Sequence, residues 1–520
     1  MVAEESKKGY IETTSIVDIG ELPSLKRRFS LWSTSAFQYS LICSVIAIAT
    51  YLSTVIGVGG PPFLIYGYIL SVICDLVICF SLAEIASAYP HPSAQVHWTY
   101  CLAPRRSKRL LSFIVGILSC AGWLFGQFAV AYTSSLFILG LAQVFNPDYV
   151  PKDWHYYLIY LGIAVGGYLI NVFAVFILPA VNYMLTGVIN FGTLFIIITL
   201  LVKTKPKQSA RYVFESISNE TGWSSKGVVF FLSLLPSIAS VTFYDGAAHM
   251  TDEIPMPERN IPLVMVISNT LSAIIAFLAV IVYMFCVVSP KNMSNPVGGE
   301  PIIQIMADSF ESKALTAIGV LVIIVSFVGS YLGYACSGSR LTWSFASSGG
   351  LPFGNSFFGK VHPKWNTPVN ALSLLLTITL ILGTVIFGSS TALSAILGSS
   401  MVCINLSYIF PIACLLFKSR FTLSPSKRFA SNDIDEMPIV LQERTKLPYF
   451  NLGFLGQILN IISVCWGCFI MVWLNFPTYY PVTSSNMNYA CVVLGITFIV
   501  AALTWTFYSR KFYVHQCKND

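Results

Sequence analysis

The chain is built from long apolar runs, many of them about 20 residues long, which alternate with short polar segments. A helix of about this length crosses the hydrocarbon core of a bilayer. Charged residues make up only 10% of the sequence, whereas a soluble domain carries about 25%. So little charge cannot cover a water-exposed surface, which excludes a soluble enzyme, a disordered protein and a fibre. The sequence therefore predicts an all-α integral membrane protein with many passes.

The apolar runs predict about twelve transmembrane helices. Their expected bounds are residues 33–56, 63–88, 110–142, 155–176, 178–202, 227–249, 261–288, 313–337, 368–388, 391–417, 453–475 and 486–508. The third run is longer than one crossing requires, so this helix is expected to tilt or to carry an extra turn.

The basic residues orient the chain in the membrane. With twelve spans both ends lie on one side, and 22 of the 30 Lys and Arg residues fall in segments on that side. Cytosolic segments carry such an excess, so both termini are expected in the cytosol. Glycosylation sequons at Asn219 and Asn292 fall in segments that this topology places outside. These features predict a membrane of the secretory pathway, with the plasma membrane favoured over the vacuolar membrane.

Few ionisable side chains lie inside the predicted spans, and each is costly there and thus a candidate functional group. Asp245 follows Pro236 in the sixth span, and proline removes a backbone hydrogen bond from the helix. A carboxylate beside weakened helix is typical of a cation or proton site in the membrane. Asp75, Glu84 and His249 are further candidates, with pairing to a neighbouring helix or solvation as the alternative for each.

The first span carries a group of small polar side chains near its centre. Ser40, Cys43 and Ser44 follow Tyr39 there. Such residues either line a binding site or let two helices approach closely, and the pattern alone favours neither.

Several other classes of site are not indicated. Cys465 and Cys468 form a Cys-Trp-Gly-Cys motif in mid-helix with no second pair, so helix packing is a better reading than zinc or redox chemistry. The net charge of +7 comes from short segments between spans, which does not indicate a nucleic-acid partner. We expect no catalytic residues, no metal and no cofactor; the lipid bilayer is the predicted surrounding, and the sequence identifies no protein partner.

Sequence patches in a fixed order carry a resemblance to a known family. They are Gly59-Gly60-Pro61, Tyr66-Gly67, the run from Ser81 to Pro90, Gln95, His97, Trp98, the run from Asn219 to Trp223, the run from Tyr244 to His249, the run from Glu253 to Arg259, Arg340, the run from Trp343 to Ala346, the run from Gly350 to Phe353, the run from Pro368 to Ala371, the run from Phe476 to Thr483, and Met487-Asn488-Tyr489. From about residue 30 to 512 the chain resembles the fungal amino acid/choline/GABA permeases, a branch of the amino acid–polyamine–organocation transporters.

The resemblance implies a LeuT-like fold, in which two inverted repeats of five helices are followed by two further helices. The first and sixth helices of this fold are interrupted near the midplane, and substrate binds between the breaks. Carried over, the breaks match 41–45 and 242–246. The parts then expected are a cytosolic N-terminal tail (1–32), a ten-helix transport core (33–417), a cytosolic loop (418–452), the last two helices (453–508) and a cytosolic C-terminal tail (509–520).

The chain departs from the family pattern at the positions that matter for substrate. Relatives often have Asn-Ser-Trp in the first span, where this chain has Cys43-Ser44-Val45. Many have Gly-Tyr-Asp in the sixth span, where Phe243 replaces the glycine. Ser93-Ala94 replaces a Gly-Gly pair, and Ser347-Ser348 replaces Arg-Asp. The substrate of any one relative therefore cannot be assigned to this chain.

The function implied is that of a secondary active permease. It would import a small amine-bearing solute, such as an amino acid, GABA or choline, with a coupled proton by alternating access. The expected substrate-binding residues are Tyr39, Ser40, Cys43, Ser44, Phe243, Tyr244 and Asp245, with Trp123 and Tyr334 as neighbours. The residues expected in proton coupling or gating are Asp245, Asp75, Glu84 and Arg340, the last paired with Asp252, Glu253 or Glu84. The alternative is a nutrient receptor that binds such a solute with little flux.

Overall fold

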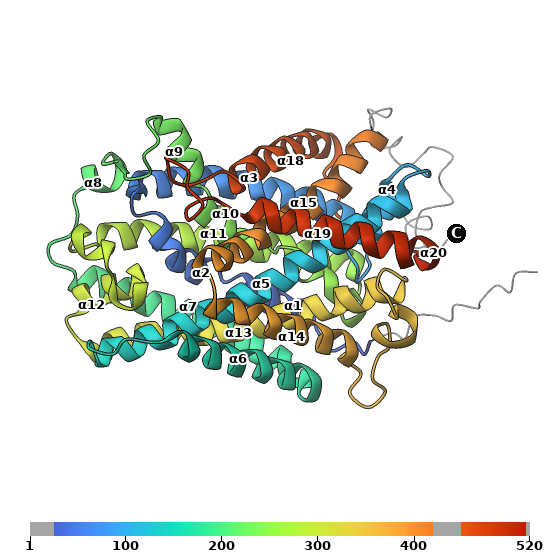
Figure 1. The fold of residues 1–520 in the computed structure, drawn as a ribbon, viewed down its shortest axis with the longest axis horizontal. Helices are drawn as coiled ribbons and strands as arrows, with labels where there is room; N and C mark the ends of the chain where they lie inside the picture. Colours follow the sequence, from blue (N-terminus) through green and yellow to red (C-terminus); the bar gives the residue numbers. More distant parts are fainter. Residues whose placement is uncertain (1–24, 420–448, 516–520) are drawn as a thin grey trace, which may run out of the picture.

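The computed structural model describes residues 25–419 and 449–515 as one bundle of helices (Figure 1). Most of the expected N-terminal tail, most of the 418–452 loop and the last five residues lie outside the described residues. In the described ranges eleven helices are long and apolar enough to cross a membrane, and a shorter apolar helix covers Lys226–Val241. Together they account for the twelve predicted spans, so the all-α multi-pass fold is confirmed.

The first half of the bundle starts with a helix in two pieces. Its elements are α1 (Leu31–Ile42), α2 (Ser44–Thr50), the 3-10 turn η1 (Tyr51–Thr54), β1 (Val58–Gly59), α3 (Gly60–Ala88), α4 (Gln95–Leu102), α5 (Lys108–Phe145), α6 (Asp153–Phe173), η2 (Val175–Ile177) and α7 (Leu178–Lys203). The 38-residue α5 is the longest of these, and it packs against α13 and α15 of the second half.

The first membrane-spanning helix of the second half is also interrupted and covers residues 226–253, after a short helix and a strand. Two further helices follow the second half. Its elements are α8 (Ala210–Phe214), β2 (Ser218–Asn219), α9 (Lys226–Leu232), α10 (Leu235–Val241), η3 (Ala248–Glu253), α11 (Pro257–Phe285), η4 (Pro290–Ser294), η5 (Val297–Gly299), α12 (Pro301–Phe310), α13 (Lys313–Ser347), η6 (Gly354–Phe358), α14 (Val369–Gly383), η7 (Thr384–Phe387) and α15 (Ser390–Ser419). The last elements are α18 (Gly453–Leu474), α19 (Ala490–Thr504), η9 (Trp505–Ser509) and α20 (Arg510–Phe512). Two halves that each begin with a broken helix, plus two more helices, form the LeuT-like 5+5 architecture.

The bundle has two distinct ends. The end called here the terminal end carries α4 and α20, beside the last described residues (Figure 1). The opposite end, called the distal end, carries α8, α9 and α12. There the two-residue strands β1 and β2 pair antiparallel, with Val58 opposite Asn219. The sequon residues Asn219 and Asn292 are both exposed.

The eighth span is longer than the sequence predicted. Its apolar run ends near residue 337, yet α13 continues as helix to Ser347. The extension contains Arg340, which is fully buried, and Trp343, which is also fully buried. The expected boundary was wrong because polar side chains ended the apolar run, while protein contacts at the terminal end keep the helix buried.

Candidate functional site

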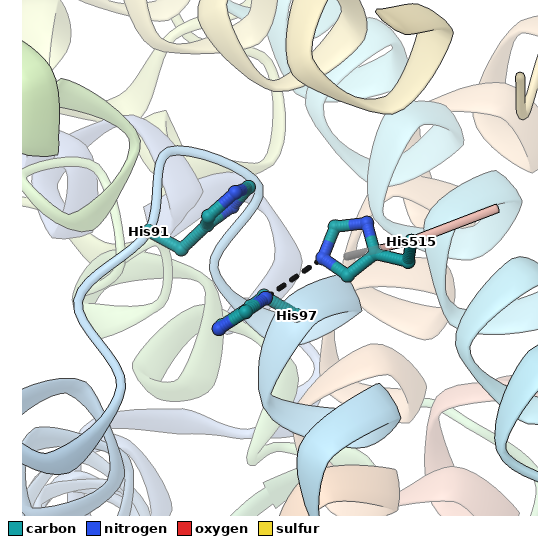
Figure 2. Close-up of side chains that lie close together, drawn as sticks. All are labelled: His91, His97 and His515. Carbon is teal, nitrogen blue, oxygen red and sulfur yellow. Dashed lines mark hydrogen bonds between the residues drawn. The ribbon is translucent and has the colours of Figure 1, made fainter. Parts of the chain in front are cut away.

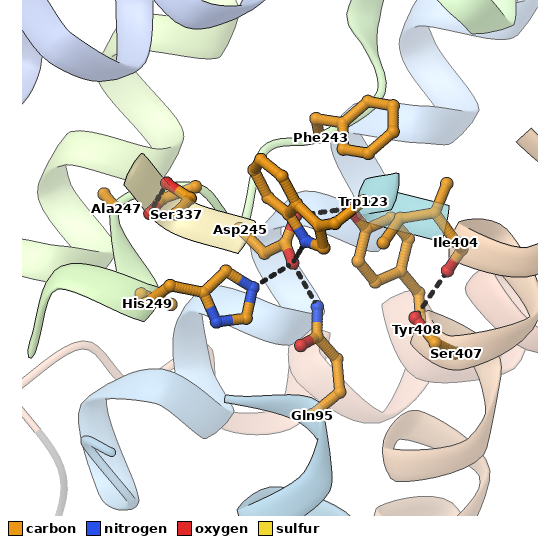
Figure 3. Close-up of polar contacts among 12 residues, drawn as sticks. Gln95, Trp123, Phe243, Asp245, Ala247, His249, Ser337, Ile404, Ser407 and Tyr408 are labelled. Atoms are coloured by element: carbon orange, nitrogen blue, oxygen red, sulfur yellow. Dashed lines mark hydrogen bonds and ion pairs between the residues drawn. The ribbon is translucent and has the colours of Figure 1, made fainter. Parts of the chain in front are cut away.

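The sixth helix is interrupted within the predicted segment, and Asp245 lies in the break. The carboxylate is fully buried and accepts four hydrogen bonds (Figure 3). Oδ2 accepts from Gln95 Nε2 at 2.5 Å, His249 Nε2 at 2.9 Å and Trp123 Nε1 at 3.2 Å, and Oδ1 accepts from Tyr408 at 2.5 Å. Asp245 thereby connects α4, α5 and α15 to the break in the sixth helix.

His249 completes a buried pair whose protonation can be read from its partners. Its Nδ1 lies 2.9 Å from the Pro92 carbonyl oxygen, which only accepts, so Nδ1 carries a proton. Its Nε2 faces Asp245 at 2.9 Å. One proton must lie between these two atoms, because a carboxylate and an unprotonated nitrogen would repel each other. The donors from Trp123 and Gln95 favour the ionised carboxylate, so the pair is best described as carboxylate and imidazolium.

The Gln38 side chain of the first helix is inserted into the break of the sixth helix. In a continuous α-helix the Ala247 N–H would donate to the Phe243 carbonyl, four residues earlier. Here the Gln38 amide lies between them: its Nε2 donates to the Phe243 oxygen at 3.0 Å, and its Oε1 accepts from Ala247 at 2.8 Å. Gly246 permits this approach, since a Cβ there would lie 2.9 Å from Gln38 Oε1. The break is thus held open by a side chain from the other interrupted helix.

Three aromatic rings cluster beside the carboxylate. The Phe243 ring lies 5.0 Å from the Trp123 ring and 4.9 Å from the Tyr334 ring, measured between centroids. Phe243 has a φ of +67°, which is the left-handed region that favours glycine and is costly for a bulky residue. At Gly126 a Cβ would lie 2.7 Å from Phe243 and 2.8 Å from Tyr334, so only glycine leaves room for these rings. Packing against Trp123 and Tyr334 therefore accommodates the Phe243 ring although its backbone conformation is unfavourable.

The first helix is also interrupted within its predicted segment, and hydroxyl groups satisfy the freed backbone. Cys43 separates α1 from α2 with a φ of +35°. The Leu41 carbonyl accepts from the Ser330 hydroxyl at 2.5 Å, and the Ser44 N–H donates to Ser272 Oγ at 3.1 Å. No charged side chain takes part in these bonds. Substrate contacts at Cys43 and Ser44 remain a prediction.

A buried ion pair lies between the sixth-helix break and the terminal end. Arg340 Nε donates to Glu253 Oε1 at 2.9 Å, and both side chains are almost fully inaccessible. The Glu253 carbonyl accepts from the backbone N–H groups of Arg28 and Phe29, each at 3.2 Å. Of the three acidic partners expected for Arg340, the structure selects Glu253. The contact joins α13, η3 and the segment before α1.

Three further predicted residues have partners outside the aromatic cluster. Tyr39 donates to Asn190 at 2.9 Å and Ser40 to Asn182 at 3.1 Å, both on α7. The Tyr244 ring contacts the Tyr408 ring, with centroids 4.7 Å apart and planes tilted by 31°.

Two of the predicted acidic residues are held by the last helices. Asp75 accepts from Trp466 on α18 at 2.8 Å, and Glu84 accepts from the Leu452 N–H at 3.1 Å, just before α18. Both contacts tie α3 to α18. These two hydrogen bonds therefore do not connect either carboxylate to Asp245.

Sequence reasoning missed three residues of the site. Gln38, Gln95 and Tyr408 all contact the sixth-helix break, yet none was a candidate. Gln38 carried a usable signal, because an amide in the middle of an apolar run needs a partner. Gln95 belonged to a patch that resembled the family but lay outside the predicted spans.

Comparisons with known proteins agree with this architecture. The family model described as amino acid permease matches residues 29–498. A choline transporter of Saccharomyces cerevisiae is 29% identical over 497 residues, covering 94% of this chain and 82% of the relative. Amino-acid permease 2 of Neurospora crassa is 27% identical over 510 residues, with 95% and 87% covered. A 7-keto 8-aminopelargonic acid transporter of Saccharomyces cerevisiae is 24% identical over 528 residues, with 92% and 91% covered.

Proposed function

Because the chain belongs to the amino acid permease family, and is thus a transporter rather than an enzyme, we propose that it imports a small amine-bearing solute together with a proton. The candidate solutes are an amino acid, GABA and choline. The mechanism proposed is secondary active transport by alternating access, with the two helix breaks as the binding region.

The observation that carries the proposal is the buried Asp245–His249 pair beside the aromatic cluster. The pair holds one proton at the point where the sixth helix changes direction. Removing this proton would leave a neutral ring facing a buried carboxylate, which costs several kcal/mol for an unpaired charge, roughly 3–5. The pair would then separate, and the network joining α4, α5 and α15 would change with it. Proton occupancy is thereby linked to the arrangement of these helices.

The aromatic cluster supports an amine or quaternary ammonium as the cargo. A cation over an aromatic ring gains about 0.5–2 kcal/mol, and Phe243, Trp123 and Tyr334 present three rings within one site. Trp123 connects the two functions, because its indole N–H donates to Asp245 while its ring contacts Phe243. The names of the relatives fit this chemistry, since they specify choline, amino acids and an amino-substituted acid.

The terminal end is proposed as the cytosolic gate. The Arg340–Glu253 pair and the N–H groups donated to the Glu253 carbonyl join three segments there. The distribution of basic residues supports a cytosolic position for this end. The distal end would then face outside, with Asn219 and Asn292 exposed for glycosylation, and the plasma membrane is the proposed location.

The test is uptake by purified protein in liposomes with an inward proton gradient. Labelled choline and labelled GABA are each offered alone and then with a panel of amino acids, polyamines and thiamine. The proposal expects gradient-dependent accumulation of at least one solute, which dissipates when the gradient is collapsed. Saturable binding without accumulation would contradict it and favour the receptor alternative.

A further inference from the structure

Three histidines from distant parts of the chain converge at the terminal end. His91 lies in the loop after α3, His97 lies on α4, and His515 follows α20 (Figure 2). One ring nitrogen of each lies within 4.8 Å of those of the other two. The chain contains six histidines, so half of them gather at this point. Their spacing in the sequence matches no metal motif, which is why the sequence did not predict a site.

His97 and His515 already face each other through ring nitrogens. His97 Nδ1 lies 2.8 Å from His515 Nε2. Two nitrogens bound tetrahedrally to one Zn²⁺ lie roughly 3.3 Å apart, given Zn–N bonds of about 2.0–2.1 Å. A shift of about half an ångström would therefore convert the hydrogen bond into a pair of metal ligands.

The outer nitrogens of these two rings have partners suited to metal ligands. A metal-bound histidine usually holds the hydrogen of its other nitrogen in a hydrogen bond. His97 Nε2 lies 3.4 Å from Cys101 Sγ, and His515 Nδ1 lies 3.0 Å from Ser348 Oγ. Metal binding requires that neither of the two facing nitrogens carries a proton, so that the ring hydrogens lie on His97 Nε2, beside Cys101, and on His515 Nδ1, beside Ser348.

Both rings are also buried in neutral form. Burial lowers the pKa of His97 well below its ordinary value, and it lowers the pKa of His515 to about 4. At neutral pH each ring keeps a lone pair, which is the state that binds a metal.

His91 is the member that must move. Its ring is stacked on the His97 ring, with centroids 4.3 Å apart and planes 13° apart, so the lone pairs of the two rings lie in nearly parallel planes and do not converge on one point. Its Nδ1 is 2.7 Å from Ser93 Oγ and accepts from the Ser93 N–H at 3.1 Å. Because His91 is half-buried on a loop, rotation of its side chain can turn the ring toward the gap between His97 and His515.

We propose that His97, His515 and His91 form a binding site for a divalent transition metal, with Zn²⁺ as the best match to imidazole ligands and tetrahedral geometry. Water would complete the coordination. The site joins the end of the chain to α4, and Gln95 on α4 donates to Asp245 two residues before His97. Bound Zn²⁺ would therefore restrain α4 and slow transport, a consequence that rests on the proposed function.

Zinc binding is tested on the purified full-length protein by calorimetric titration with Zn²⁺ alone. The expected result is one high-affinity Zn²⁺ per chain. Mutation of a residue that only hydrogen-bonds a metal ligand already weakens metal affinity by about tenfold or more. Loss of a ligand itself should cost more, so His97→Gln and His515→Gln should each weaken affinity by more than about tenfold. His91→Gln should weaken it as well. The matched control is His362→Gln, an exposed histidine at a different site, which should bind as the wild type does.

Two results would overturn the site. One is a wild type that binds no stoichiometric Zn²⁺; the other is a His97→Gln, His515→Gln double variant with unchanged affinity. An unchanged His91→Gln would overturn the third ligand. Electron paramagnetic resonance of Cu²⁺ bound to the wild type gives a test that does not depend on whether the variants fold. Couplings to imidazole nitrogens would support the site, and coordination by oxygen alone would refute it.

The transport consequence is measured separately, with Zn²⁺ buffered inside the liposomes. Uptake by the wild type and by His362→Gln should slow and recover on adding a chelator, while uptake by His515→Gln should not respond. If Zn²⁺ binds but uptake is unaffected, the restraint on α4 is wrong. If no solute accumulates in any condition, the proposed function fails, and the metal titration still decides the site.

Discussion

The two helix breaks solve the same problem with different chemistry. At the first break one residue, Cys43, leaves the helix, and hydroxyls of Ser330 and Ser272 satisfy the freed backbone. At the sixth break residues 242–247 separate α10 from η3, and an amide, a carboxylate and an imidazole take part. The first break is uncharged and short, whereas the second contains the Asp245–His249 pair and is hydrogen-bonded to α1, α4, α5, α13 and α15.

The difference indicates how work is divided between the breaks. Neutral hydroxyl bonds change little with protonation, so the first break can shape a pocket but cannot sense a proton gradient. The sixth break can do so, because the occupancy of one proton decides whether Asp245 and His249 attract or repel each other. In the proposed mechanism Gln38, which is bonded to both sides of the sixth break, would carry a change there to the first helix.

The largest effect is expected from Asp245→Asn, which removes the charge at the sixth break. The NH2 group that replaces one oxygen would face either the Tyr408 donor or the donors from Gln95 and Trp123, leaving buried donors unpaired at about 1–3 kcal/mol each. We expect the protein to reach the membrane but accumulation to be abolished, as measured by labelled uptake and surface immunodetection. Asp153→Asn, at an exposed position in the first turn of α6, is the matched control. Normal concentrative uptake by Asp245→Asn would remove Asp245 from the mechanism.

The next effect is expected from His249→Gln. Glutamine can donate one hydrogen bond to Asp245 but cannot carry a proton, so the network survives in part while coupling is lost. We expect exchange of labelled for unlabelled solute to continue, and gradient-driven accumulation to fall by about tenfold or more, which corresponds to a loss of about 1.4 kcal/mol. Accumulation that still follows the proton gradient would show that the proton is carried elsewhere.

Gln38→Met should have a moderate effect on stability. The variant keeps the side-chain volume but leaves the Ala247 N–H unpaired and takes one of two donors from the Phe243 carbonyl, at a cost of about 1–3 kcal/mol. Thermal unfolding in detergent should show a clear decrease in Tm. Gln127→Met, which removes a buried bond to Tyr331 and no bond to the backbone of either break, is the control and should lower Tm less. Equal decreases would mean that Gln38 is an ordinary buried amide.

Ser330→Ala should have the smallest effect. It removes one neutral hydrogen bond to the Leu41 carbonyl, worth about 0.5–1.5 kcal/mol. Tm should fall slightly, and the dependence of uptake on the proton gradient should stay unchanged. A loss of coupling as complete as in His249→Gln would contradict the division of work between the breaks.

The sequence predicted the fold well because the bilayer allows few alternatives. Backbone groups in lipid must bond within a helix, so each apolar run of sufficient length specifies one span. The predicted helix boundary is wrong where a helix continues beyond its apolar run and is surrounded by protein instead of lipid. α13 continues to Ser347 because Arg340 finds Glu253, a partner 87 residues away that the apolar pattern does not reveal.

The site was less predictable, since its contacts join residues far apart in the chain. Asp245 stood out as a carboxylate in a span, but its partners Gln95 and Tyr408 lie 150 and 163 residues away. The protonation of His249 depends on the Pro92 carbonyl, a backbone group that no residue pattern marks. Glu84 accepts from the Leu452 N–H, a backbone group 368 residues away that the sequence pattern does not reveal, and its role in gating stays a prediction.

Proton flux during solute uptake tests the central claim most directly. Liposomes containing the protein and a trapped pH-sensitive dye are given an accepted solute without an imposed pH gradient, at a fixed membrane potential. The account predicts that solute entry acidifies the lumen in the wild type, and that His249→Gln exchanges solute without acidification. Solute entry without proton movement in the wild type, or undiminished acidification in His249→Gln, would contradict a shared proton at the sixth-helix break.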